Sequence, residues 1–140
     1  MSTSAETKEL VRRFESAMNT RQLDLLDEII SPDVVRHCEA TPGIEVTDLD
    51  QLKDFLRADA SVFPDNKQTF NHVLVDEDMV GVWATYEGTQ MGKMGPFPPS
   101  EKYVKFSFAC ILRMERGKIA EWWVTWDNMS ILAQLGHLPG

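Results

Sequence analysis

Residues 103–127 read YVKFSFACILRMERGKIAEWWVTWD, and this stretch decides the fold. Polar and apolar side chains alternate along much of both halves, a period of two that is typical of β-strands. The polar tripeptide ERG between the halves is typical of a hairpin turn. We therefore predict strands over residues 103–114 and 118–127, paired as an antiparallel hairpin.

The same period of two occurs upstream of this hairpin. It predicts strands over residues 68–76 and 79–90, joined by the polar sequence DED. The intervening segment 91–101 differs, because it holds two glycines and three prolines. Proline cannot donate a hydrogen bond to a neighbouring strand, so we expect this segment to form a flexible flap or rim.

The first third of the chain has a period of 3.6 and therefore indicates helices. Thr3 and Glu6 have the spacing of a capping box, and Thr47 with Asp50 opens a later helix. The sequence SPD after residue 30 ends a helix, because the residue before a proline is disfavoured in helical conformation. The predicted helices cover residues 5–18, 22–29, 47–63 and 129–135, and a short strand covers residues 34–38.

Helices first and a meandering sheet second indicate one α+β domain over residues 1–140. We expect helices packed on a strongly curved antiparallel sheet, which would form a cone with an internal pocket. An apolar pocket of this kind is the default binding site for a small molecule.

The composition of the 140 residues excludes several classes of protein. Fourteen Lys and Arg stand against 22 Asp and Glu, a net charge of −8 that disfavours binding to nucleic acid or to an anionic membrane surface. The N-terminus has no pattern of a secretion signal, and no apolar run is long enough for a spanning helix. Cys38 and Cys110 both lie in segments predicted to be buried. We expect a cytoplasmic chain with reduced cysteines.

Both faces of the last predicted strand are largely apolar. Trp123 and Thr125 fall on one side, whereas Trp122, Val124 and Trp126 fall on the other. Burial on both sides indicates helices over one face and a cavity or a subunit contact over the other. We therefore expect a homodimer or a higher homo-oligomer.

Signatures of metal and cofactor sites are absent from the sequence. The glycines do not match a phosphate-binding loop, and the three histidines are too far apart for the spacing of metal ligands. We expect no cofactor and no metal. Cys110 lies in an apolar run, where an inert buried thiol is expected rather than a nucleophile.

A few polar residues in apolar surroundings are candidates for chemistry. Asp127 follows the WWVTW sequence, and an aromatic, poorly hydrated pocket would raise the pKa of its carboxyl group toward the range useful for proton transfer. Alternatively, Asp127 caps the last helix. His37 is either a catalytic partner or a hydrogen-bonded wall residue, and His72 lies in the core or in the cavity. Glu121 is expected to be solvated or salt-bridged.

The order of elements and several motifs resemble the SnoaL-like polyketide cyclase family, which has the nuclear transport factor 2-like fold. The resemblance covers about residues 6–136. Its strongest piece is the sequence from RMERGKIAEWW through WD to LAQLG, and LVRRF, FPD and PPS support it. The fold hosts cyclases, hydroxylases, dehydratases, isomerases and binding domains, so the resemblance is less specific for the activity.

The resemblance implies a cofactor-free enzyme that closes a ring of a polyketide-like aromatic substrate by an intramolecular aldol reaction. It implies Asp127 as the general acid/base and His37 as its polar partner. Many relatives have His where this chain has Trp122. The substrate-binding walls are expected to include Trp83, Trp123, Trp126, Phe70, His72, Phe106, Phe14 and Met18. The alternatives are a hydroxylase, hydratase or hydrolase in which Asp127 activates water, and a non-catalytic, dimerising module that binds a small hydrophobic molecule.

Overall fold

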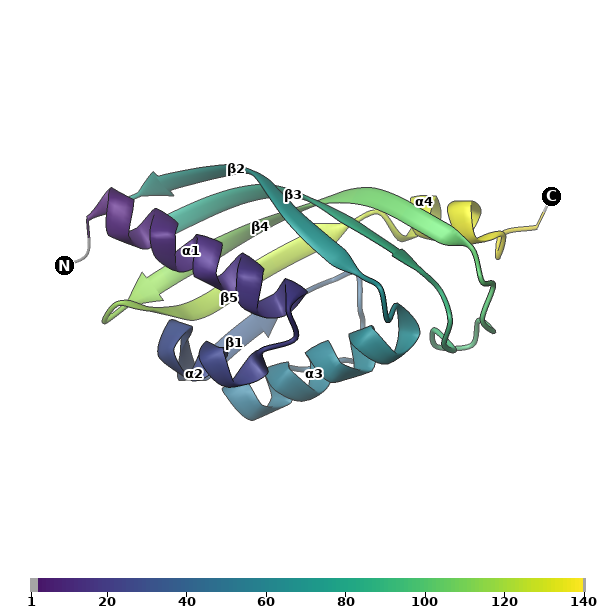
Figure 1. Ribbon diagram of the computed structural model, residues 1–140, viewed down its shortest axis with the longest axis horizontal. Helices are drawn as coiled ribbons and strands as arrows, with labels where there is room; N and C mark the ends of the chain where they lie inside the picture. The colour runs from purple at the N-terminus through teal and green to yellow at the C-terminus, as the bar shows by residue number, and fades with distance from the viewer. Residues whose placement is uncertain (1–2, 140) are drawn as a thin grey trace.

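The computed structural model describes residues 3–139, which form a five-stranded sheet with helices α1 and α3 packed against one face (Figure 1). The strands are β1 (Ile30–His37), β2 (Lys67–Asp76), β3 (Met79–Thr89), β4 (Tyr103–Glu115) and β5 (Lys118–Trp126). The helices are α1 (Ser4–Asn19), the 3₁₀ turn η1 (Leu23–Leu25), α2 (Leu26–Ile29), α3 (Leu49–Val62) and α4 (Asn128–Leu135). The α+β architecture predicted from the sequence is confirmed.

Strands β2 to β5 form the predicted antiparallel meander, and the sheet order is β1-β5-β4-β3-β2. In the β4–β5 turn, Arg116 and Gly117 have φ angles of 53° and 76°. Two consecutive positive φ angles are the geometry of the tight hairpin turn that matches the twist of the strands. Strand β1 differs from the expectation, because it pairs with β5 in parallel. The long connection through α3 and the meander lets β1 return beside β5 in this direction.

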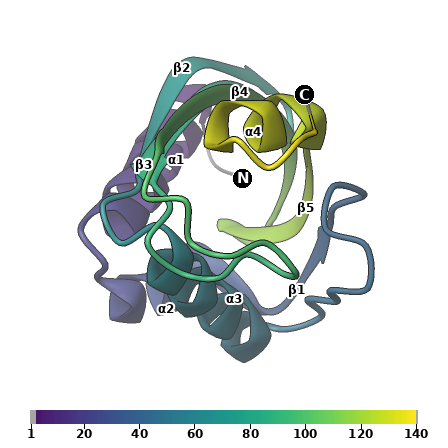
Figure 2. The ribbon, with the colours of Figure 1, turned by 90° about the vertical axis from the view of Figure 1, so that its right-hand side faces the viewer.

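The sheet curls around an interior that α1 and α3 close on the other side (Figure 2). Irregularities in the register accompany the curvature, as β-bulges do. One lies in β2 between Phe70 and His72, where α1 bonds the backbone: Glu15 Oε2 accepts from Phe70 N at 2.6 Å, and Arg12 donates to Phe70 O at 2.8 Å. Another makes Ala120 an extra residue in β5.

The helix caps follow from the sequence, with one correction. The Thr3–Glu6 capping box at the start of α1 is confirmed. Helix α3 is capped by Asp48, whose side chain accepts from Gln51 N at 2.8 Å, and Thr47 instead contacts the Gln51 side chain. The expectation that Thr47 opens this helix is therefore wrong, because the aspartate one position later reaches the free amide.

Residue Gln90 anchors the segment that follows β3. Its side chain is fully buried, and its Nε2 donates to the carbonyl oxygens of Gly92 and Pro98 at 3.0 and 3.1 Å. Its Oε1 accepts from Ser100 N at 3.3 Å and lies 2.7 Å from His137 Nε2. One amide group thus ties both ends of the segment 91–101 together.

The same segment is attached to the end of α3. The backbone amides of Met91 and Gly92 donate to Val62 O at 2.8 and 3.1 Å. A Cβ atom on Gly92 would lie 2.4 Å from Ser61 O, so only glycine allows this approach. The segment therefore forms a rim at the end of the sheet that also carries α4 (Figure 2).

None of the helices within residues 3–139 has the length and apolar character needed to cross a membrane.

Candidate active site inside the curved sheet

The aromatic residues expected to bind substrate divide between the two faces of the sheet. Alternation in β5 places Trp122 and Val124 inside, in the core, and Trp123 and Thr125 outside. The predicted division of these residues between two faces is confirmed, and the structure decides which face is the inner one. The expected wall residues on the inner side are Phe14, Met18, Phe70, Phe106 and Trp126, and those on the outer side are His72, Trp83 and Trp123. The structure therefore does not bring the expected wall residues into one pocket.

Three of the inner residues belong to the solid core. Phe14, Met18 and Phe70 are 0%, 4% and 3% exposed. The Phe14 ring packs edge-on against Phe70 and Trp122, with centroid distances of 6.1 and 5.3 Å. Because these side chains fill the space between α1 and the sheet, they leave no room there for a ligand.

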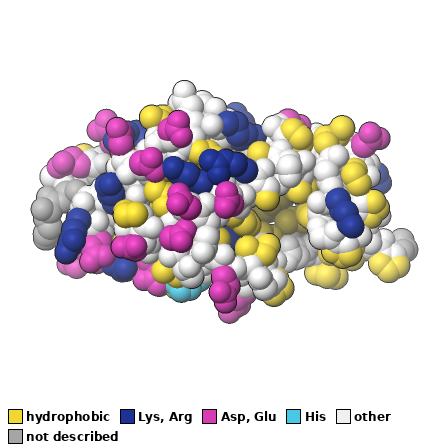
Figure 3. All heavy atoms as spheres, turned by 90° about the horizontal axis from the view of Figure 1, so that it is seen from below, with side chains coloured by type: hydrophobic (Ala, Val, Ile, Leu, Met, Phe, Trp, Pro, Cys, Tyr) yellow, Lys and Arg dark blue, Asp and Glu magenta, His cyan; other side chains and the backbone are white. Residues whose placement is uncertain are grey.

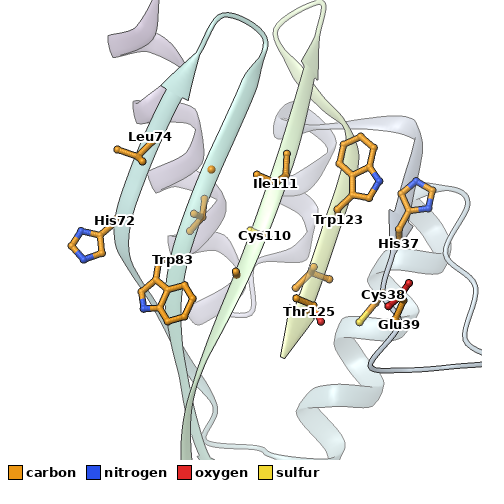
Figure 4. A pocket seen from close by; sticks show the side chains of 14 residues that line it. His37, Cys38, Glu39, His72, Leu74, Trp83, Cys110, Ile111, Trp123 and Thr125 are labelled. Atoms are coloured by element: carbon orange, nitrogen blue, oxygen red, sulfur yellow. The ribbon is translucent and has the colours of Figure 1, made fainter. Parts of the chain in front are cut away.

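The outer face of the sheet carries a shallow apolar groove of about 540 Å³ (Figure 4). Trp83, Ile111 and Trp123 project from neighbouring strands on the side away from the helices, and His72 and Leu74 lie at the β2 edge. Ile111 is paired in register with both Gly81 and Trp123. Bulky side chains on neighbouring strands thus make a continuous apolar surface.

His37 lies on this outer face and pairs with a carboxylate other than Asp127. Its Nε2 is 2.7 Å from Glu121 Oε2, and its ring stacks on Trp123 at a centroid distance of 5.3 Å. Arg113 Nε donates to Glu121 Oε1 at 3.1 Å, and the bonds from His37 and Arg113 lower the pKa of Glu121. The expected salt bridge of Glu121 is confirmed.

The register also separates His37 from Asp127. His37 is opposite Trp123, four residues before Asp127, which is about 13 Å along a strand at about 3.3 Å per residue. The structure therefore does not place His37 beside Asp127, because the parallel β1–β5 pairing aligns His37 with Trp123 and brings its side chain to Glu121.

Asp127 caps helix α4. Its Oδ1 accepts from the backbone amides of Met129 and Ser130 at 2.9 and 3.3 Å, and the residue is exposed. The indole nitrogen of Trp126 donates a hydrogen bond to Asn128 Oδ1 at 2.8 Å, and not to Asp127. The expectation of a poorly hydrated aromatic pocket around this carboxyl is wrong, because the strand ends there and the helix begins.

A different carboxyl group faces the aromatic interior. The Tyr86 hydroxyl on β3 donates to Asp59 Oδ2 on α3 at 2.8 Å. Burial raises the pKa of Asp59 more than the bond from Tyr86 and the charge of Arg36 lower it. Tyr86 also stacks on Phe106, with ring centroids 5.1 Å apart. Burial, above all, raises the pKa of Tyr86, so its hydroxyl stays a proton donor at neutral pH.

Arg36 on β1 is the cationic member of this interior. Its guanidinium carbon lies 4.2 Å from the ring centroid of Phe55 on α3, and 5.2 and 5.8 Å from those of Trp122 and Trp126. Loss of hydration lowers the pKa of Arg36, and the nearby Asp59 acts in the opposite direction. We call Arg36, Phe55, Asp59, Tyr86, Phe106, Trp122 and Trp126 the interior cluster.

Sequence reasoning missed the polar members of the interior cluster, although a signal was present. Leu52, Phe55 and Asp59 recur at helical spacing, so Asp59 continues the apolar stripe of α3. Val34 and Arg36 share the inward side of β1 by the period of two. A charged residue on an apolar stripe is the pattern that marks both positions.

The surface is hollowed near this end of the molecule. Figure 3 shows a hollow with hydrophobic side chains around it, toward the end that carries α4 and the rim segment. Phe55, Phe106 and Trp126 are half-buried, unlike the solid core beneath α1. Within residues 3–139, no group of three or more His, Cys, Asp or Glu side chains is arranged to hold a metal ion.

Comparisons with solved structures show the same fold in other proteins. The chain is similar to TsrD from Streptomyces laurentii, with 23% identity, a TM-score of 0.88, and coverage of 99% of this chain and 100% of the other. It is similar to AclR, a candidate hydroxylase from Streptomyces galilaeus, with 26% identity, a TM-score of 0.83, and coverage of 98% and 100%. It is also similar to IdmH, a candidate polyketide cyclase from Streptomyces antibioticus, with 26% identity, a TM-score of 0.82, and coverage of 93% and 98%.

No curated protein matches the sequence. The sequence profile of a known family does match, and it spans residues 8–135, from the first turns of α1 to the end of α4. The curved sheet, its helices and this match agree, and the chain belongs to the SnoaL-like polyketide cyclase family.

Proposed function

We propose that this protein is a cofactor-free enzyme of the polyketide cyclase type, and that the reaction takes place in the interior cluster with Asp59 as the acid/base group. The observation that carries the proposal is the hydrogen bond from Tyr86 to Asp59, 2.8 Å long, among the aromatic rings of the curved sheet. A carboxyl group whose pKa is raised by burial is a stronger base once it is ionised.

In the proposed reaction, the Asp59 carboxylate removes a proton from a carbon atom between two carbonyl groups. The resulting enolate carbon attacks a second carbonyl carbon of the same molecule and closes the ring. The new alkoxide takes the proton back from Asp59, which restores the carboxylate. The hydrogen bond from Tyr86 stabilises the charged carboxylate of Asp59. General acid/base catalysis by a positioned side chain contributes about 10²–10⁴-fold to the rate.

The aromatic members of the interior cluster would hold the flat substrate in a reactive geometry. Tyr86 stacks on Phe106, and the Phe106 and Trp126 ring centroids are 6.5 Å apart. Rings in this arrangement favour a polycyclic or polyketide-like aromatic molecule. Holding both reacting groups together can contribute several kcal/mol to lowering the barrier. The hollow of Figure 3 is the proposed entrance.

Proton exchange tests this proposal without knowledge of the natural substrate. An aromatic β-keto ester in D₂O reports removal of the acidic proton through the rate at which deuterium enters that carbon. We expect Asp59→Asn to lower the enzyme-catalysed rate about 10²–10⁴-fold. Asp127→Asn is the matched control and should keep the rate. The opposite result would support the sequence-based prediction that Asp127 is the acid/base.

The similarity to AclR favours a hydroxylase as a second candidate. The two reactions differ in the mass of the product. Ring closure leaves the mass unchanged, or lowers it by one water molecule, whereas hydroxylation, which requires an oxidant such as dioxygen, adds one oxygen atom. Mass spectrometry of the product of a β-keto ester that carries a second carbonyl group would separate them, and a gain of oxygen would contradict the cyclase proposal.

We also propose that the outer face of the sheet is covered by a second copy of the chain. Leu74, Trp83 and Ile111 are 72%, 51% and 42% exposed, and Trp123 is 37% exposed. A contiguous apolar surface of this kind is typical of protein interfaces. A homodimer would place this face against its equivalent, with the interior cluster on the opposite side of each sheet.

A further inference from the structure

Two buried nitrogen atoms inside the curved sheet have no hydrogen-bond partner. They are Arg36 Nε and Trp122 Nε1, both in side chains that are more than nine-tenths buried. Within residues 3–139 neither atom has an oxygen or nitrogen acceptor, although the thiols of Cys38 and Cys110 lie near Arg36 and Trp122, respectively. A buried donor without an acceptor costs about 1–3 kcal/mol. Native proteins hold few such groups, and each one requires an explanation.

The two residues that carry these donors are neighbours in the sheet. Arg36 on β1 and Trp122 on β5 are partners in the register of the sheet, so both side chains leave the same face at the same level. The guanidinium carbon lies 5.2 Å from the centroid of the Trp122 ring. A ligand that reaches one of these side chains would therefore also meet the other.

Arg36 has no ion-pair partner among the described residues. Within residues 3–139, no carboxylate oxygen lies within 4.0 Å of its guanidinium. Burial raises the pKa of the Cys110 thiol to about 12, although Trp122 and Arg36 act in the opposite direction. This thiol is therefore neutral and can be only a weak acceptor. Asp59, the carboxyl group whose charge acts on Arg36, has a raised pKa and accepts a hydrogen bond from Tyr86.

A buried guanidinium without an anionic partner is a binding site for an anion. Phe55, Trp122 and Trp126 surround Arg36 with ring faces, so an anion that reaches it must also fit among flat apolar walls. A small hydrated ion such as phosphate would lose its water without replacement there. A negatively charged oxygen on a flat ring system would pair with the guanidinium, and the ring system would pack against the aromatic side chains.

We propose that Arg36 and Trp122 form an oxyanion site, which binds the delocalised negative oxygen of a flat aromatic ligand, such as the enolate of a 1,3-dicarbonyl compound. The inference rests on the proposed function, because removal of a proton by Asp59 would generate such an enolate oxygen. It deepens that function by assigning the substrate class and by naming two residues that hold the charge while the ring closes.

Binding of three small probes tests this inference. The enolate of 2-acetyl-1,3-indandione carries the proposed oxyanion, 2-naphthoate carries a carboxylate, and 2-naphthamide is flat and neutral. We expect calorimetric titration to give at least tenfold tighter binding of the enolate than of the amide. Tighter binding of 2-naphthoate than of the enolate would identify a carboxylate ligand and contradict the enolate assignment. Equal binding of all three probes, or binding of none, would overturn the oxyanion site.

Three variants connect the preference to the named residues. Arg36→Met removes the charge and should abolish the preference for the enolate, and Trp122→Phe keeps a ring without the donor and should weaken it about threefold to tenfold. Arg57→Met is the matched control, because Arg57 is an exposed arginine paired with Asp54. A preference that survives in Arg36→Met would overturn the inference.

A measurement on the unmodified protein remains decisive if Arg36→Met does not fold. The ¹⁵N resonance of Arg36 Nε should shift when the enolate is added and stay in place with 2-naphthamide, and an unchanged resonance would overturn the inference. Asp59→Asn separates the two proposals, because it should keep the preference for the enolate while deuterium exchange is lost. Exchange that persists in Asp59→Asn contradicts the acid/base assignment alone.

Discussion

The Tyr86 hydroxyl donates a hydrogen bond of 2.8 Å to Asp59 Oδ2 and thereby joins the second half of strand β3 to the last turn of helix α3. The bond crosses the interior of the curved sheet. It partly offsets the cost of burying a carboxyl group, yet the pKa of Asp59 remains raised. The same pair is thus a structural contact and the proposed acid/base group.

The raised pKa of Asp59 predicts a pH-dependent stability. The native state holds this proton more tightly than the unfolded chain does, so native protein binds more protons between about pH 3.9 and the raised native pKa. The free energy of unfolding contributed by Asp59 therefore falls as pH rises through this window. Asp59→Asn removes this pH-dependent contribution. The free energy of unfolding of the variant, relative to that of the natural protein, should therefore increase with pH. Urea unfolding from pH 4 to pH 8 measures the difference.

An aspartate on the same helix is the control for this experiment. Asp54 is exposed and pairs with Arg57 at 3.1 Å, so Asp54→Asn should change stability little and should not reproduce the trend with pH. A difference between Asp59→Asn and the natural protein that stays constant over pH, or that shrinks as pH rises, would contradict the burial of the Asp59 charge.

Replacement of Asp127 measures its role as a helix cap. Asp127→Ala leaves the amides of Met129 and Ser130 without their acceptor and should lower the free energy of unfolding by about 1 kcal/mol. Asp127→Asn should cost much less, because asparagine is an equally good capping residue. Urea unfolding of both variants compares them, and equal losses would show that the charge matters rather than the cap.

A single lysine on the outer face tests the proposed homodimer. Ile111→Lys places a charge in the middle of the apolar groove, and a second copy would meet it with an identical charge, so the variant should sediment as a monomer. Leu25→Lys is the matched control, because Leu25 in η1 has the same 42% exposure outside the groove. Sedimentation velocity measures the oligomeric state of both variants. A natural protein that is monomeric at micromolar concentrations would contradict the dimer.

Gly92 tests how firmly the rim segment is held. Gly92→Ala would force a Cβ atom against Ser61 O and separate the segment from the end of α3. We expect a loss of about 1–3 kcal/mol and faster hydrogen exchange at Met91. Gly81→Ala is the control, because a Cβ atom there meets only Ile111 Cδ1 at an ordinary 3.8 Å. Unchanged exchange in Gly92→Ala would show that the rim is free to move.

The sequence predicted the elements well because their signals are local. The turn at Arg116 and Gly117, the capping box of Thr3 and Glu6, and the alternation along β5 each depend on residues a few positions apart. The predicted helix over residues 22–29 is instead the 3₁₀ turn η1 followed by the single turn α2. Apolar spacing alone does not distinguish these short forms, because each spans too few residues.

Asp127 and His37 show where prediction from motifs ends. A carboxylate after a strand is followed by a helix whose first amides need an acceptor, and this local demand fixes the position of Asp127. The position of His37 instead depends on a long-range contact, the parallel pairing of β1 with β5. This pairing aligns His37 with Trp123 and brings its side chain to Glu121. The residues near His37 in the sequence do not indicate that pairing.

By itself, the sequence determined the period of each segment, the hairpins, the family and which tryptophans of β5 share a face. The tertiary structure alone decided which side chains meet. It brought Arg36, Asp59 and Tyr86, from three separate elements, into one interior and sent Trp83 and Trp123 to the opposite face. The physical reason is that periodicity follows from local backbone geometry, whereas the curl of the sheet and its parallel edge pairing depend on contacts between distant residues.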